Sequence, residues 1–240
     1  MTAMLQKELQ AFFSSLMAYV IIGFFLILTG LWVWIFPDTN ILDSGYADLS
    51  PLFRLAPYVL MFLAPAITMG LLAEERKTGT LELLLTSPLT TLQIILGKYV
   101  ASLVIIAGIL VFTSIYVVSI YYLASPVGNI DVAALVGSYI GLLLLAAVFL
   151  AIGLSASALT QSQVVAFLIG TFLCFLCYQG FDAWTMLKTW EKYSLWIAQL
   201  GMLYHYEALS RGVIDLRDVL YFCSFSFLSL LVANLALHKK

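Results

Sequence analysis

Residues 132–181 read VAALVGSYIGLLLLAAVFLAIGLSASALTQSQVVAFLIGTFLCFLCYQGF and contain no Asp, Glu, Lys or Arg. A helix that crosses the hydrocarbon core of a bilayer needs about 20 apolar residues, so this stretch is too long for one crossing. The polar segment SASALTQSQ, at 155–163, divides it. The stretch therefore predicts two membrane-spanning helices, at about 132–156 and about 162–181.

The rest of the chain has the same apolar character. Of its 240 residues, 63% are hydrophobic and 10% are charged, whereas an ordinary soluble domain is about 45–50% apolar and about 25% charged. Mean hydropathy is +1.05. The formal net charge of −2 offers no basic face for nucleic acid. We therefore expect an all-α integral membrane protein without a nucleic-acid partner.

Charge-free stretches elsewhere predict four more spans, so residues 1–240 form a single transmembrane domain with six helices. The amino-terminal segment MLQKELQAFFSSLMAY has apolar residues at helical spacing among polar ones. This pattern predicts a helix lying in the membrane interface before the first span, and the alternative is the frayed start of a tilted span. The expected spans are about 16–36, 55–73, 99–123, 132–156, 162–181 and 218–237.

The positions of Lys and Arg predict the orientation, because short cytoplasmic loops carry an excess of these residues. With both termini inside, the inner set is Lys7, Arg76, Lys77, Lys98, Lys239 and Lys240, and all of these lie close to span ends. Most of the outer Lys and Arg lie in one long segment, where the rule is weaker. All the tryptophans fall on the predicted outer side. We therefore expect both termini in the cytoplasm.

Apart from Asp218 at the very start of the last one, the expected spans contain no Asp, Glu, Lys or Arg, which argues against an ion-coupled pump, a cation channel or a voltage sensor. A phosphate-binding loop of the form G-x-x-x-x-G-K-[ST] is absent, since Gly97-Lys98 is followed by Tyr99. The sequence offers no nucleophile–base constellation and no metal-ligand set. Cys174 and Cys177 are interpreted as packing residues in an apolar helix. If this protein does work, the energy for that work is therefore expected to come from another chain.

One compact charged stretch, EERKTGTLELLLTSPLTT at 74–91, lies between the second and third spans. Its charged start, 74–77, is expected to end span two. Gly79 is expected to break that helix. Thr80 can then N-cap a new short helix, with Glu82 at its second position, where the positive end of the helix dipole favours an acid.

The same stretch predicts an amphipathic helix at the cytoplasmic surface. Leu81, Leu84 and Leu85 lie on one face at helical spacing. Ser87 is expected to cap the next helix, with Pro88 in its first turn, where a missing N–H has no effect on the helical hydrogen bonds. Such an element can insert into a groove on a soluble partner; alternatively, it is an ordinary charged loop beside the membrane.

The motif E-E-R-K-T-G-T-L-E-L-L-L-T-S-P, followed by L-G-K just before a span, resembles the permease subunits of the type-2 ABC exporter family. The resemblance implies that this loop is a coupling helix that seats on a separate ABC ATPase subunit, present in two copies. That subunit would hold ATP and Mg, so no cofactor is expected in this chain. A second permease, identical or paralogous, and a bacterial cytoplasmic (inner) membrane are also implied. The residues expected at the ATPase contact are Glu74, Glu75, Gly79, Thr80, Glu82, Leu85 and Pro88.

A second motif, YHYEALSRGVIDLRD at 204–218, resembles the segment before the last span in the permeases associated with gliding motility. A copper-maturation permease of nitrous-oxide reductase systems is a close cousin of that branch. In the gliding branch the second permease is distinct and carries a large outer domain. The resemblance implies outer helices that dip into the membrane and cap the pathway; a structural outer hairpin is the alternative. The residues of this outer gate segment are Tyr204, His205, Glu207, Arg211, Gly212 and Asp215.

Local chemistry in this segment predicts two helix ends. Glu207 precedes Arg211 by four residues, which is the favourable order for a helical ion pair. Gly212 can close that helix in a left-handed cap. Asp215 can then N-cap the sixth span, with Asp218 in its first turn.

Pro57 and Pro65 both interrupt span two. Proline in a membrane helix removes an N–H and frees a carbonyl. Because the second span resembles a pathway-lining helix, one interpretation of the two prolines is a pathway hinge, and the other is a static bend.

Together these observations predict a non-enzymatic permease subunit of an ATP-driven ABC exporter. The alternative is a membrane scaffold that moves no substrate and converts the strokes of a partner ATPase into mechanical action on envelope proteins. A transporter needs a continuous cavity between two permease halves, whereas a scaffold can be sealed.

Overall fold

The computed structural model describes residues 2–37, 39–86, 90–185 and 194–238. Within these ranges the regular structure is entirely helical, which confirms the expected all-α class. Six of the described helices are long and apolar enough to cross a membrane. They are Leu16–Trp34 (α2), Ser50–Thr78 (α4), Thr91–Phe112 continued by Ser114–Leu123 (α6 and α7), Val132–Leu159 (α8), Gln163–Phe175 continued by Leu176–Gly180 and Phe181–Thr185 (α9, η1 and α10) and Leu216–His238 (α13).

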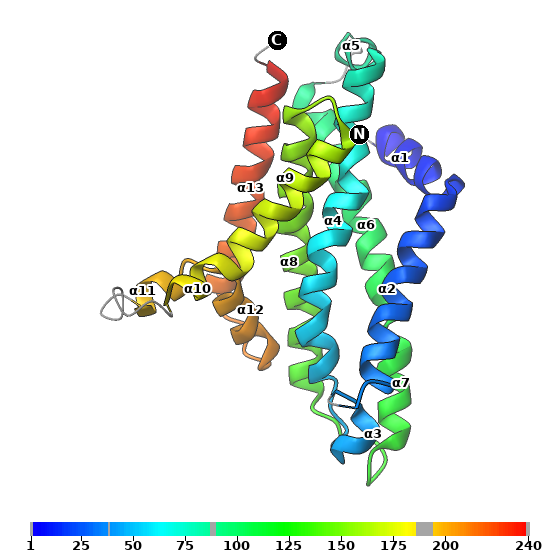
Figure 1. Cartoon of the computed structure of the whole chain (residues 1–240), viewed down its shortest axis with the longest axis vertical. Helices are drawn as coiled ribbons and strands as arrows, with labels where there is room; N and C mark the ends of the chain where they lie inside the picture. Colours follow the sequence, from blue (N-terminus) through cyan, green and yellow to red (C-terminus); the bar gives the residue numbers. More distant parts are fainter. Residues whose placement is uncertain (1, 38, 87–89, 186–193, 239–240) are drawn as a thin grey trace.

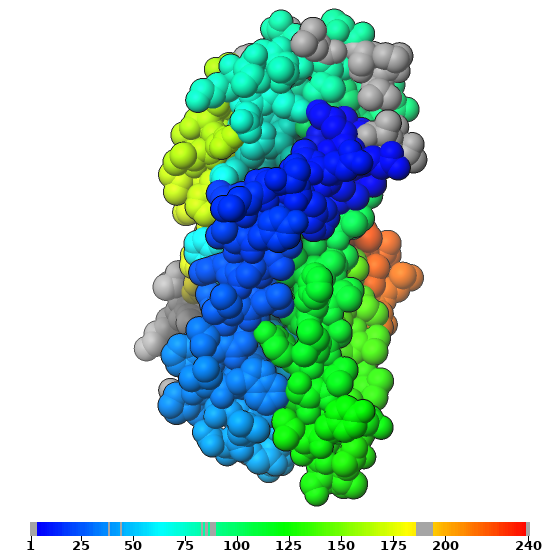
Figure 2. Space-filling view, turned by 90° about the vertical axis from the view of Figure 1, so that its right-hand side faces the viewer, coloured from blue at the N-terminus to red at the C-terminus, as the bar shows by residue number. Residues whose placement is uncertain are grey.

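Within the described ranges, five shorter helices connect or precede the long ones. They are Thr2–Ser14 (α1), Ile41–Ser44 (α3), Thr80–Leu85 (α5), Ser194–Ala198 (α11) and Met202–Ser210 (α12). Both chain ends and α5 lie toward one end of the bundle, the α5 end, and α3 lies at the other, the α3 end (Figure 1). At the α5 end α1 runs obliquely across one face of the molecule (Figure 2).

Helices α4 and α8 form the centre of the bundle. Within the apolar windows of these two helices 61% of residues are buried, against 33% or less in the other four candidate spans. Phe25, Leu60, Phe149 and Phe222, from four different helices, are fully buried in one core. The outer faces of α2, α9 and α13 instead expose large apolar side chains, as expected for helices in contact with lipid.

Small residues allow the central helices to approach closely. A Cβ on Gly153 of α8 would lie 2.2 Å from Thr68 Oγ1 and 3.1 Å from the Cα of Pro65, both on α4. A Cβ on Gly170 of α9 would lie 3.2 Å from the Cβ of Pro65. Such contacts are typical of membrane helices, which associate through small residues rather than through a hydrophobic driving force.

The turn between α4 and α5 forms at the expected glycine but with different capping. Gly79 has φ +75°, and its left-handed conformation ends α4, as predicted. The prediction that Thr80 N-caps the short helix is wrong, because Gly79 occupies that position and no side chain caps α5. Thr80 is instead the first helical residue, with its hydroxyl 2.9 Å from that of Thr78, and Glu82 is the third.

The start of the next helix also differs from the prediction. Helix α6 begins at Thr91, and its N-cap is Thr90, whose hydroxyl accepts from the Gln93 N–H while the Gln93 side chain accepts from the Thr90 N–H. This reciprocal capping box has the sequence signature Thr-x-x-Gln. As the start signal of the helix, it prevails over Ser87 followed by proline. Ser87 itself, together with Pro88, lies outside the described residues.

Candidate functional site

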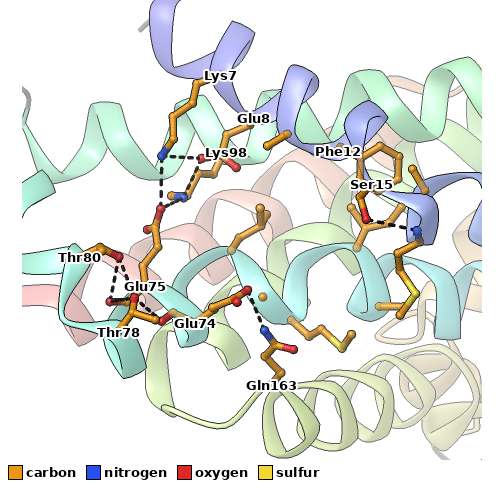
Figure 3. A pocket seen from close by; sticks show the side chains of 18 of the residues that line it. Lys7, Glu8, Phe12, Ser15, Glu74, Glu75, Thr78, Thr80, Lys98 and Gln163 are labelled. Atoms are coloured by element: carbon orange, nitrogen blue, oxygen red, sulfur yellow. Dashed lines mark hydrogen bonds and ion pairs between the residues drawn. The ribbon is translucent and has the colours of Figure 1, made fainter.

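A cavity of about 940 Å³ opens at the α5 end, between α1, the start of α2, α4 and α5. Its polar lining comes from Lys7, Glu8, Glu74, Glu75, Thr78, Thr80, Lys98 and Gln163 (Figure 3). Its apolar lining includes Phe12, Ile21, Ile67 and Leu71. The cavity therefore joins a charged zone to an apolar one.

Lys98 lies at the centre of the charged zone. Its ammonium is 2.9 Å from Glu8 Oε1 and 2.8 Å from Glu75 Oε1, and its side chain is 1% exposed. The Lys7 ammonium lies farther away, 3.7 Å from the same Glu75 oxygen (Figure 3). This buried ion cluster joins α1, α4 and α6.

The ion cluster corrects the expectation that no charged side chain lies within a span. The candidate span Thr91–Leu123 includes Lys98, whereas the expected span begins one residue later, at about 99, and leaves Lys98 in the helix that leads into it. The capping box at Thr90 starts this helix two turns before Lys98.

Glu74 points away from the ion cluster toward α9. Its Oε2 accepts a hydrogen bond of 2.8 Å from the Gln163 amide at the start of that helix (Figure 3). Glu74 and Glu75, both expected at the ATPase contact, are therefore engaged within the chain. They connect the carboxyl-terminal end of α4 to three other helices.

Helix α5 is anchored by its apolar face. Leu81 is buried, in a cluster with Leu72, Ile95 and Leu154. Thr80 and Glu82, which flank Leu81 in the sequence, are exposed. The leucine face, expected to enter a groove on a partner, therefore holds α5 to its own bundle, at least at Leu81.

Two residues expected at the ATPase contact cannot be placed in the same way. Pro88 and the side chain of Leu85 lie outside the described part of the chain. Nearby, the Arg76 guanidinium donates to the Ala236 carbonyl over 3.4 Å, so the end of α4 also contacts α13.

The outer gate segment forms α12 and the turn that follows it. The predicted ion pair is present, with Arg211 Nη2 3.5 Å from Glu207 Oε2, and both side chains are exposed. Gly212 has φ +82°, as predicted for a left-handed helix end. Asp215 accepts a hydrogen bond of 3.0 Å from the Arg217 N–H in the first turn of α13, which confirms its capping role.

Helix α12 is fixed to α13 through His205. Its Nδ1 is 2.6 Å from Asp218 Oδ1, and its Nε2 is 2.8 Å from the Gln199 carbonyl oxygen. The ring also stacks on Tyr221, with 4.0 Å between ring centroids. Tyr204, the neighbouring residue of the gate segment, is exposed.

Pro57 and Pro65 lie inside α4, which continues as a helix through both. Because Pro57 has no N–H, the Phe53 carbonyl lacks its helical partner. The Tyr206 hydroxyl of α12 donates to that carbonyl over 2.7 Å. Burial raises the pKa of Tyr206 well above its ordinary range, so the hydroxyl stays a donor. Pro57 thus links α4 to the outer gate segment.

These features define the chain as a multi-pass membrane protein with a short anchored helix at one end. Residues 3–213 match the ABC-2 family transporter proteins, and the chain belongs to this family. It is therefore a membrane permease of an ABC transporter, and the family implies an ABC ATPase as partner. No curated protein matches the chain. The resemblance to type-2 ABC permeases is confirmed at family level, and the gliding-motility branch stays a prediction.

Proposed function

We propose that this permease works in an exporter and that α5 is the element that seats on its ATPase. The observation that carries the proposal is the position of α5. Leu81 anchors this helix in the bundle, and Thr80 and Glu82 remain exposed for a partner. ATP and Mg would be held by the ATPase, and this chain would supply neither a cofactor site nor a catalytic residue.

The connections of α5 support a mechanical role. A displacement of α5 acts on α4 through the single turn at Gly79. Four residues before Gly79, Glu75 contacts Lys98, which also contacts Glu8. Because uncompensated buried charges are costly, these ion pairs resist separation. We infer that α1, α4 and α6 move together when the ATPase subunits close.

A complete transporter would contain two permeases and two ATPase subunits. The second permease, a copy of this chain or a paralogue with an outer domain, would complete a pathway between the two halves. Lys7, Arg76 and Lys77 lie at or near the α5 end. The positive-inside rule therefore favours both termini in the cytoplasm of a bacterium, with the chain in its inner membrane.

The docking role is tested with the variant Thr80→Lys plus Glu82→Lys. Both side chains are exposed, so the folded bundle is expected to persist. The partner ATPase should no longer co-purify, because the charge at these two exposed positions changes from −1 to +2. Glu207→Lys, an exposed acid on α12, is the matched control and should retain the ATPase. Full recovery of the ATPase with the double variant would refute docking at α5.

A further inference from the structure

A second cavity, of about 550 Å³, lies away from α5. It is lined by residues near the start of α4 and by residues of η1, α8 and α12. Its wall carries three tyrosines, two arginines, three serines and one glutamate. The lining residues are Ser50, Phe53, Arg54, Tyr58, Ser138, Tyr178, Leu203, Tyr206, Glu207, Ser210 and Arg211. We call it the outer cavity.

A π-helical turn positions one wall of the outer cavity. Residues Leu176–Gly180 form η1 between α9 and α10. Single π turns inside α-helices occur frequently at functional sites. Here the turn directs Tyr178 into the protein, where the side chain is only 2% exposed. The adjacent Gln179 accepts a hydrogen bond of 3.0 Å from the Tyr58 hydroxyl.

The Tyr178 hydroxyl has no hydrogen bond to any described residue, although its ring is closely packed. Ring centroids of Tyr58, Phe149 and Tyr206 lie 5.7, 6.1 and 6.5 Å away. The hydroxyls of Tyr58 and Tyr206 both have acceptors. Tyr178 lines the cavity, and its hydroxyl has no partner among the described residues, so the hydroxyl is available to a ligand there.

Arg54 supplies a second unused donor. Its guanidinium makes no ion pair or hydrogen bond with the described residues, and it lies one turn into α4. The other arginine, Arg211, is paired with Glu207. The wall therefore carries one more positive than negative charge, and a guanidinium binds the oxygens of phosphate or carboxylate in a forked geometry.

We propose that the outer cavity binds a phosphate-bearing amphiphile. Arg54 pairs with the phosphate, the Tyr178 hydroxyl donates to a ligand oxygen, and the rings of Tyr58 and Tyr178 contact the apolar part. Phosphate is favoured over carboxylate because the cavity adjoins the first turn of α4, at the end of a membrane span, where lipid phosphates lie. The binding does not depend on docking at α5, so either proposal can fail alone.

The test measures binding to the purified full chain in detergent by native mass spectrometry. The probes are phosphatidylglycerol, diacylglycerol with the same acyl chains, and glycerol 3-phosphate. Phosphatidylglycerol should bind at least about tenfold more tightly than diacylglycerol, since the charge-assisted hydrogen bond to Arg54 is lost without the phosphate. If glycerol 3-phosphate competes with equal affinity, the natural ligand of the outer cavity is a soluble phosphate ester. If it competes only weakly, the natural ligand is a lipid.

Two variants test whether the ligand binds in the outer cavity. Arg54→Gln should weaken phosphatidylglycerol binding about tenfold, whereas Arg217→Gln, an exposed arginine outside the cavity, should not. Tyr178→Phe should weaken binding and leave the thermal stability of the free protein unchanged or raised, because its hydroxyl has no partner to lose. Tyr121→Phe, exposed on α7, is its control.

Three results would overturn the proposal. The first is equal binding of diacylglycerol and phosphatidylglycerol. The second is equal behaviour of the Arg54→Gln and Arg217→Gln variants. The third is a loss of stability in Tyr178→Phe without a change in affinity, which would assign the hydroxyl a structural role.

Discussion

Lys98 is held between Glu8 and Glu75 at the junction of three helices, with 1% of its side chain exposed. Without Lys98, Glu8 and Glu75 would keep only the more distant and exposed Lys7 as a partner, and breaking a buried ion pair costs about 3–5 kcal/mol. Lys98→Met should therefore lower the free energy of unfolding by this amount, measured by denaturant titration in detergent. Lys77→Met, which changes an exposed lysine, should have little effect.

The charge interpretation of Lys98 has its own control. In the triple variant Lys98→Met with Glu8→Gln and Glu75→Gln, no buried charge remains in this cluster, so most of the lost stability should return. If the triple variant is as unstable as Lys98→Met alone, packing of the lysine stem, rather than charge, accounts for its burial.

The hydrogen bond from Tyr206 to Phe53 depends on Pro57. Tyr206→Phe removes the donor from a buried carbonyl, and about 1–3 kcal/mol of stability should be lost. In a Pro57→Ala background residue 57 regains an N–H that can reach the same carbonyl. The Tyr206→Phe change should then cost less, as a double-mutant cycle in thermal unfolding would measure. Equal costs in both backgrounds would contradict this coupling.

At the scale of elements, α12 is packed against α8 without room for a side chain. A Cβ on Gly137 would lie 2.4 Å from the Leu209 carbonyl oxygen and 2.9 Å from the Gly212 Cα, both backbone atoms. Gly137→Ala should therefore displace α12 and destabilise the protein, as a lower melting temperature would report. Gly23→Ala, in α2 with nothing within 4 Å of the new methyl, should be neutral or slightly stabilising. Equal melting temperatures for the two variants would show that α12 shifts freely.

The long elements could be predicted from the sequence because each one needs only a run of apolar residues. Helix α8 starts at Val132, where the charge-free stretch starts. Helix ends were harder to predict, since local capping decides them. The permissive backbone of Gly79 indicates the end of α4, whereas Ser87 followed by proline is a competing start signal that conceals the N-cap at Thr90.

Contacts between elements could not be predicted, because they depend on how helices distant in sequence pack. The charged stretch was recognised as a unit, yet nothing in it indicates that Glu75 contacts Lys98 while Glu74 contacts Gln163. The π turn at η1 and the approach of Tyr206 to Phe53 are likewise products of tertiary packing.

At the scale of the whole molecule, the distribution of charged residues between the two ends of the bundle predicts its orientation in the membrane. The α5 end carries Glu74, Glu75, Arg76 and Lys77 on α4, followed by Glu82 on α5. The opposite end carries Asp43, Asp48 and Asp131. Lys and Arg beside span ends favour the cytoplasmic side, whereas acids have little influence on orientation. The α5 end is therefore expected in the cytoplasm, where an ATPase can reach it.

This orientation predicts the labelling of single cysteines in intact cells. In a background with Cys174, Cys177 and Cys223 replaced by alanine, Val127→Cys places an exposed thiol beyond α7. A membrane-impermeant maleimide should label it without permeabilisation. Glu82→Cys, on the exposed side of α5, should be labelled only after the membrane is opened, because its thiol faces the cytoplasm. The reverse pattern would place α5 outside, where no ATPase could bind it and no nucleotide could drive the bundle.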